Sequence, residues 1–223
     1  MERNFERFEE YLDNLLSDHY AQPPDEGHTE YAQKAIDWAY DIIDDTSVRA
    51  LGCCQGFCEP MFRKRDIAWV GVTIGEDYAA CRKKGLKVFR EDMTFLPFLD
   101  DTFDGVFSRH TLEHSPFPIL TLMEWRRVCT KHLVLVLPSP DYWGSWGRNH
   151  YSVFDKERWW WAFARAGWKI IHEKEVTTND RLFLDHYMPE ITDVGERRQL
   201  KFPGPPKSVE FWMVLEKTEE RIE

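Results

Sequence analysis

The chain has no long hydrophobic run. A membrane-spanning helix needs about 20 consecutive apolar residues, whereas apolar stretches such as Leu133–Leu137 have only the length of a strand. The first residues, Met1 to Glu6, are charged and lack the hydrophobic region of a signal peptide. The sequence therefore predicts a cytoplasmic protein with no membrane partner.

An excess of positive charge is also missing. The 29 lysine and arginine residues are outnumbered by 39 aspartate and glutamate residues, which gives a formal net charge of −10. Broad binding to a phosphate backbone requires a surface rich in lysine and arginine. Nucleic acid is therefore a disfavoured partner.

Cysteine is scarce, and its distribution does not suit a disulfide framework. Three of the five cysteines, Cys53, Cys54 and Cys58, lie in or beside one turn. Adjacent cysteines rarely pair, and a core of this size does not need disulfides. No second cysteine pair of matching spacing completes a zinc site. We therefore expect reduced thiols and no metal.

What the chain does have is a regular alternation of strand patterns and helical patterns. With 223 residues, of which 43% are hydrophobic, it can form one sizeable core. The alternation predicts an α/β fold, with a mainly parallel Rossmann-like sheet and helices on both faces. Predicted strands cover 47–51, 68–73, 86–90, 103–108, 132–137, 168–171 and 209–215, and predicted helices cover 3–17, 29–43, 57–65, 76–84, 117–129 and 155–165.

We predict a single domain, 1–223. Residues 1–45 are expected to form a helical cap, and 46–176 together with 207–217 the core. The polar, proline-containing segment 177–206 is expected to be an insertion.

Small residues follow the first core strand, from Gly52 to Gly56. Glycine in such a turn lets a ligand approach backbone N–H groups at the carboxyl edge of a parallel sheet. Small residues also let a helix pack closely on a strand. The turn by itself therefore does not identify a ligand site.

Four short motifs follow this turn: Glu91-Asp92-Met93, Leu96-Pro97-Phe98, Phe103-Asp104-Gly105-Val106 and Leu112-Glu113-His114. Their order resembles a class I S-adenosylmethionine (SAM)-dependent methyltransferase, of the type 11-like group. The resemblance covers about 48–176 and the strand at 209–215. It implies a seven-stranded, mainly parallel sheet whose last strand is antiparallel, with SAM as the cofactor.

The resemblance also assigns cofactor contacts. Asp92 matches the acid that binds the adenine amino group, and Met93 supplies a backbone N–H beside the ring. Thr73 stands where a carboxylate usually binds the ribose hydroxyls, and Glu76 is a second candidate for them. Ser108 ends the strand that faces the methionine end of SAM and the acceptor. The full expected set is Gly52, Cys53, Gly56, Thr73, Glu76, Asp92, Met93 and Ser108.

A histidine-rich segment, His110-Thr111-Leu112-Glu113-His114, matches the His-x-x-Glu-His pattern of a zinc peptidase class. That motif needs both histidines on one helical face, and Ser115-Pro116 interrupts any helix here. The context therefore favours a methyltransferase loop. His110 is the candidate general base, because an imidazole takes up a proton near neutral pH. His150 is the second candidate.

Aromatic residues after the fifth strand suggest where an acceptor binds. Loops at the carboxyl ends of strands build the ligand crevice of open α/β sheets. We expect an acceptor pocket or lid formed by Tyr142, Trp143, Trp146, His150 and Tyr151. In the triplet Trp159–Trp161, at least two side chains are expected in the core. Glu124 and the arginines after it are expected to form a structural ion pair.

Two functions follow from the resemblance, and a third follows from the histidine motif. The first is SAM-dependent methyl transfer to a small-molecule or sugar-like acceptor, with a homodimer or protein partner left open. The second is a catalytically inactive methyltransferase-fold protein that serves as a binding or regulatory subunit, because Ala50, Cys54 and Thr73 depart from the family's cofactor motifs. The third is a zinc hydrolase that uses His110 and His114.

Overall fold

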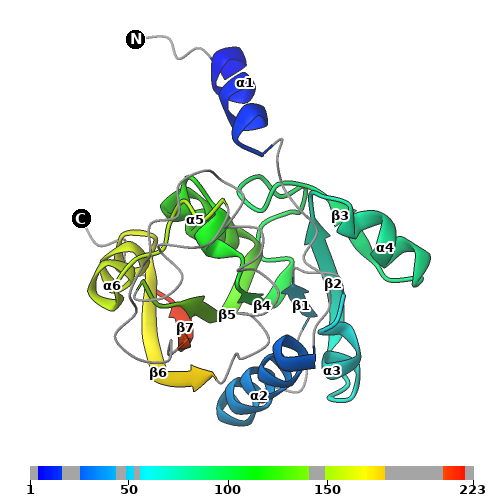
Figure 1. Ribbon diagram of the computed structural model, residues 1–223, viewed down its shortest axis with the longest axis vertical. Coiled ribbons are helices and arrows are strands. Elements are labelled where there is room, and N and C mark those ends of the chain that lie inside the picture. The colour runs from blue at the N-terminus through cyan, green and yellow to red at the C-terminus, as the bar shows by residue number, and fades with distance from the viewer. Residues whose placement is uncertain are drawn as a thin grey trace, which may run out of the picture.

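The computed structural model describes residues 5–16, 26–43, 49–52, 56–140, 149–178 and 208–218. Within them, seven strands form one mixed sheet in the order β3-β2-β1-β4-β5-β7-β6 (Figure 1). The strands are β1 (Arg49–Gly52), β2 (Ala68–Thr73), β3 (Val88–Arg90), β4 (Phe103–Arg109), β5 (Cys129–Pro138), β6 (Trp168–Thr178) and β7 (Ser208–Lys217). The predicted α/β, Rossmann-like class is confirmed.

The strand pairing places a topological reversal in the middle of the sheet. β1 pairs in parallel with both β2 and β4, and the pairs β2–β3 and β4–β5 are also parallel. β7 runs antiparallel to its two neighbours, β5 and β6. The chain moves outward from β1 to β3 and then returns to β4 beside β1. In open α/β sheets, ligands bind outside the carboxyl ends of the strands at such a reversal.

Helices cover both faces of the sheet, as the alternation predicted. α2 (Glu26–Ile43), α3 (Glu59–Arg63) and α4 (Asp77–Lys83) supply buried apolar side chains to one face. α5 (Pro118–Val128) and α6 (Lys156–Arg165) pack on the other. Among the described helices, none combines the length and the apolar character needed to cross a membrane.

The first helix, α1 (Phe5–Leu16), extends away from the rest of the molecule (Figure 1). Its Phe8 ring lies 6.3 Å from the Phe95 ring and 5.5 Å from the Phe117 ring. The helix therefore contacts the loop after β3 and the residue that precedes α5. Residues 1–4, 17–25 and 44–45 of the expected cap, like 179–206 of the expected insertion, lie outside the described residues.

Two expectations about the C-terminal half were wrong. β6 continues to Thr178, well beyond the predicted 168–171. Its charged residues concealed the strand pattern, and they are tolerated because β6 is an edge strand with one face toward solvent. In α6, Trp159 is fully buried, whereas Trp160 and Trp161 are exposed. A helix lying on a sheet buries only one face, so a run of three tryptophans places one of them in the core.

The predicted ion pair on α5 is confirmed, and it fixes the loop before β4. Glu124 lies 2.7 Å from Arg127 and accepts a hydrogen bond from the Leu96 backbone N–H at 2.8 Å. Arg127 in turn donates to the carbonyls of Leu96 and Phe98. Glu124 and Arg127 on α5 therefore hold the backbone of the Leu-Pro-Phe motif in place. The three cysteines within the described chain, Cys58, Cys81 and Cys129, are buried reduced thiols, as expected.

Candidate active site at the carboxyl edge of the sheet

The turn after β1 begins the candidate site. Gly52 ends β1, Cys53 and Cys54 lie outside the described residues, and Gly56 has φ +76°, a left-handed conformation that glycine adopts without strain. A Cβ atom on Gly56 would collide with Leu86. Close packing against the segment after α4 therefore accounts for this glycine without any ligand.

Asp92 and Met93 follow β3 at the same edge. The Asp92 Oδ1 atom accepts a hydrogen bond from the Thr94 backbone N–H at 2.8 Å, which orients the carboxylate. The Asp92 Oδ2 atom is buried and has no hydrogen-bond partner among the described residues. Trp125 Nε1 donates to the Met93 carbonyl at 3.0 Å and holds that backbone in place. The carboxylate is thus fixed by one oxygen and offers the other to a donor.

The remaining expected cofactor residues lie at the ends of β2 and β4. Thr73 is the last residue of β2 and is buried, whereas Glu76 is exposed just before α4. Ser108 is buried near the end of β4, and its hydroxyl has no partner within the described chain. Parallel pairing aligns these strand ends along one edge of the sheet. The structure therefore brings the expected residues to a common edge, with two buried oxygens still able to bind a ligand.

His110 lies directly after β4 and faces a buried carboxylate. Its Nε2 atom is 2.8 Å from Glu210 Oε1, and Arg109 Nη2 is 2.7 Å from the same oxygen. Trp212 Nε1 donates to Glu210 Oε2 at 2.7 Å. His110 also has φ +46°, a conformation that is uncommon outside glycine and concentrates at functional sites.

These contacts determine the charge of Glu210. Burial alone raises its pKa, but the positive charges of Arg109 and His110, with hydrogen bonds from His110 and Trp212, lower that pKa well below its usual range. Glu210 therefore stays ionised. A carboxylate that faces one ring nitrogen of a histidine orients the imidazole and fixes where its proton lies.

Glu113 is a second buried carboxylate, in η1 (Leu112–His114), and its environment differs. It is 1% exposed, and neither carboxylate oxygen has a hydrogen-bond partner among the described residues. Burial raises the pKa of Glu113 to about 8, although nearby backbone N–H groups and the charge of Arg109 oppose that rise. An isolated carboxylate in such a site is costly unless a cation or a donor joins it.

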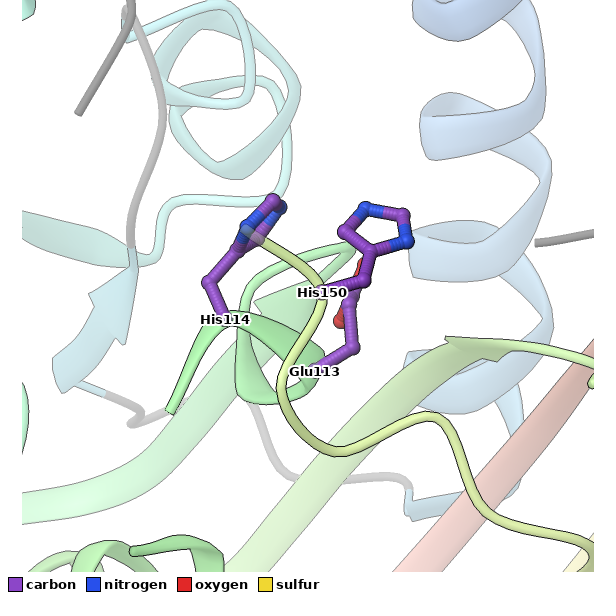
Figure 2. Close-up of side chains that lie close together, drawn as sticks. All are labelled: Glu113, His114 and His150. Atoms are coloured by element: carbon purple, nitrogen blue, oxygen red, sulfur yellow. The ribbon is translucent and has the colours of Figure 1, made fainter. Parts of the chain in front are cut away.

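His114 and His150 lie beside Glu113 (Figure 2). The two imidazole rings are 4.6 Å apart in an edge-to-face arrangement. His114 Nδ1 lies 3.0 Å from the Asn149 carbonyl oxygen. His150, the second candidate base, therefore lies with His114 and Glu113. The structure does not bring His110 and His114 together as the expected zinc ligands, because His110 faces Glu210. Of the expected aromatic pocket, Tyr142, Trp143 and Trp146 lie outside the described residues.

Two central residues, Glu113 and Glu210, were missed from the sequence as site residues. Glu113 is part of the histidine motif, but only the two histidines of that motif were considered as metal ligands. Glu210 begins Glu210-Phe211-Trp212, where a single acid in an apolar strand was the available signal. An acid in an apolar run predicts a buried partner, but Arg109 lies 101 positions away in sequence, and only the sheet brings the two together.

Known proteins share this fold and part of this sequence. Residues 50–137 match the family model described as a methyltransferase domain. A search of the curated proteins finds no match.

Solved structures superpose over most of the chain. A putative methyltransferase from Bacillus halodurans has a TM-score of 0.66 at 17% identity, over 84% of this chain and 98% of its own. The cyclase SpnF has a TM-score of 0.64 at 16% identity, over 93% and 94%. A SAM-dependent methyltransferase from Methanosarcina mazei has a TM-score of 0.60 at 14% identity, over 81% and 99%.

The chain thus has the fold of these methyltransferase structures, and its residues 50–137 are similar to the methyltransferase domain. At these identities the solved structures establish the fold alone. The presence of a cyclase among them shows that the fold does not by itself fix the reaction.

Proposed function

We propose that this protein transfers a methyl group from SAM to a small-molecule or sugar-like acceptor. The supporting observation is the Asp92 carboxylate, whose Oδ2 atom is buried and lacks a hydrogen-bond partner within the described chain. This is where the family places an acceptor for the adenine amino group. The methyltransferase-domain match over 50–137 and the SAM-dependent neighbour from Methanosarcina mazei support the same cofactor.

The expected residues have distinct tasks in this proposal. Asp92 accepts from the adenine amino group, and the Met93 backbone lies against the ring. Thr73 and Glu76 bind the ribose hydroxyls, while Gly52, Cys53 and Gly56 are the proposed cofactor contacts after β1. Ser108 Oγ lies toward the methionine end. The sulfonium of bound SAM makes the methyl group electrophilic, so the protein's task is to align the acceptor atom with it.

His110 is the proposed general base for an acceptor that must lose a proton. Its Nε2 atom lies 2.8 Å from Glu210 Oε1, so the carboxylate stabilises the imidazolium that forms when the ring gains a proton. Nδ1 is then the ring atom that takes up the acceptor's proton. Glu210 is a positioning residue in this arrangement, because it acts on the acceptor only through the imidazole.

Calorimetric titration of SAM and of its demethylated product tests the cofactor assignment. The sharpest variant is Asp92→Asn, because the amide can keep an Oδ1 acceptor for the Thr94 N–H and replaces the second oxygen with a donor. A hydrogen bond to a charged acceptor contributes about 1.5–3 kcal/mol, so we expect SAM affinity to fall at least about tenfold. Asp92→Ala should lose at least as much.

Asp66→Asn is the matched control. Asp66 lies in the turn before β2, at the opposite edge of the sheet, and asparagine tolerates its φ of +57°. This variant should bind SAM like the unmodified chain. Equal SAM affinity in Asp92→Asn and the unmodified protein would refute the placement of the adenine. No binding of SAM or its product at millimolar concentration would favour the non-catalytic subunit suggested by Ala50, Cys54 and Thr73.

A further inference from the structure

Three potential metal ligands converge beside β4. Glu113, His114 and His150 each offer one ligand atom, and all of these atoms lie within 4.8 Å of one another. Figure 2 shows the Glu113 carboxylate directed toward the His150 side chain, with the two imidazole rings beside each other. The residues come from two segments, since Glu113 and His114 belong to η1 and His150 lies in the loop before α6.

The state of Glu113 points independently to a ligand. Its side chain is 1% exposed, and no donor among the described residues forms a hydrogen bond to either oxygen. The nearby cation, Arg109, is paired with Glu210, and its Nη2 atom lies 2.7 Å from Glu210 Oε1. A buried carboxylate is normally paired with a cation or coordinates a metal.

The two segments are tied together independently of any ligand. The Ser152 backbone N–H donates to the Glu113 carbonyl at 2.9 Å, and the Ser152 hydroxyl donates to the Ser115 carbonyl at 2.6 Å. The segment that carries His150 is therefore attached to η1. His114 Nδ1 lies 3.0 Å from the Asn149 carbonyl oxygen, and this contact orients the His114 imidazole. A carbonyl on one ring nitrogen fixes the tautomer and leaves the other nitrogen for a metal.

We propose that Glu113, His114 and His150 bind a divalent first-row transition-metal ion, with Zn²⁺ as the reference ion. Two imidazoles and one carboxylate match the ligand preference of such ions, whereas Mg²⁺ and Ca²⁺ prefer oxygen ligands. Bonds of about 2.0–2.2 Å place neighbouring ligand atoms roughly 3.0–3.5 Å apart. The present spacing therefore requires only small side-chain rotations. Three protein ligands leave at least one position for water or substrate.

The site occupies a functional position in the fold. η1 begins two residues after His110, the proposed base. If the proposed methyl transfer holds, a metal-bound oxygen acceptor would be polarised beside His110. This role rests on the proposed function, whereas the metal site itself does not.

Metal binding to the full, tag-free chain tests the proposal. The protein is treated with a chelator, exchanged into chelator-free buffer and titrated by calorimetry with ZnCl₂, and separately with MgCl₂. We expect one Zn²⁺ per chain and much weaker Mg²⁺ binding. Co²⁺ should give a visible absorption band that Zn²⁺ abolishes.

Three variants assign the ligands, and one serves as a control. His150→Ala, His114→Ala and Glu113→Gln should each weaken Zn²⁺ binding by more than the roughly 10- to 100-fold that loss of an outer-shell partner costs. His172→Ala removes an exposed histidine on β6 and should bind Zn²⁺ like the unmodified chain. Thermal unfolding of each chelated variant shows whether it is folded.

The outcomes separate this proposal from the proposed function. Absence of saturable Zn²⁺ binding would overturn the site, as would a folded His150→Ala variant with unchanged affinity. Equal losses in His172→Ala would show adventitious surface binding and would also overturn it. SAM titration of the same chelated protein reports on the cofactor alone, so failure of one proposal is distinguishable from failure of the other.

Discussion

Two buried carboxylates near the end of β4 have opposite surroundings. Glu210 and Glu113 are both 1% exposed. Glu210 lies within 2.8 Å of Arg109 and His110 and accepts a hydrogen bond from Trp212, and these partners lower its pKa. Neither carboxylate oxygen of Glu113 has a hydrogen-bond partner among the described residues, and burial raises its pKa to about 8 although nearby backbone N–H groups oppose the rise. Burial alone therefore does not define a carboxylate's role; its partners do.

The difference separates a structural element from a binding element. The partners of Glu210 come from β4 and β7, two strands of the sheet separated by β5. Glu113 lies where the strand has ended and a short η1 turn follows. A paired carboxylate fixes strand positions, whereas an unpaired one beside two histidines is prepared for a ligand.

The largest effect that tests this comparison is expected for Glu210→Ala. Removing one partner of a buried ion pair leaves an uncompensated charge on Arg109, which costs about 3–5 kcal/mol. Urea unfolding measures this loss. The control is Glu216→Gln, also on β7. It breaks the exposed ion pair with Lys169 of β6 and should cost at most about 1 kcal/mol. Similar losses in both variants would show that Glu210 is not a buried structural pair.

Glu113→Met should have the opposite sign. Methionine has a similar length, and it removes a buried polar group that has no donor within the described chain. Such groups cost about 1–3 kcal/mol when unsatisfied, so the metal-free variant should gain about that much in free energy of unfolding. The same urea experiment on chelated protein measures it. A clear loss of stability would mean that the carboxylate is satisfied in the native state.

Acid unfolding gives a smaller effect per pH unit. Because the folded-state pKa of Glu210 is lowered, its contribution to stability is complete above its unfolded pKa of about 4.3. That contribution is lost as pH falls further toward the folded pKa. One proton taken up on unfolding gives a slope of about 1.4 kcal/mol per pH unit. Urea unfolding from pH 5 to pH 3 should therefore be less steep in pH for Glu210→Gln than for the unmodified chain. Identical slopes would contradict this assignment.

The smallest effect is expected for a partly exposed carboxylate, Glu124. Glu124→Gln keeps an oxygen for the Leu96 N–H but removes the charge opposite Arg127. Partly exposed pairs contribute roughly 0.2–1 kcal/mol, so the free energy of unfolding should fall by no more than about that amount. A loss comparable with that of Glu210→Ala would show that charge, and not burial, dominates both sites.

Much of the fold was predictable because its signals are local. β2 was placed at 68–73 with its observed bounds, since a mostly apolar run too short for a helix, bounded by polar residues, indicates a buried strand. The ion pair between Glu124 and Arg127 was also predictable, because residues three positions apart share a helical face. The length of β6 was missed, since edge strands tolerate charges that obscure the pattern.

The candidate site was less predictable. Asp92 was predicted as a cofactor contact from its place after β3, but only the tertiary structure shows that its Oδ2 atom is buried without a hydrogen-bond partner among the described residues. His110 and His114 share one motif, yet the backbone turns between them and directs them to different carboxylates. His150 was grouped with an aromatic loop, and its position beside Glu113 depends on the hydrogen bonds of Ser152.

The sequence by itself determined the α/β class, the order of the strands along the chain and the methyltransferase motifs, because these depend on periodicity and on residues that are close along the chain. Tertiary structure decided which charges meet. Arg109 and Glu210 are 101 positions apart and pair because β4, β5 and β7 lie side by side in one sheet. Protonation and ligand binding depend on such long-range contacts and on burial, and neither is a property of a local sequence pattern.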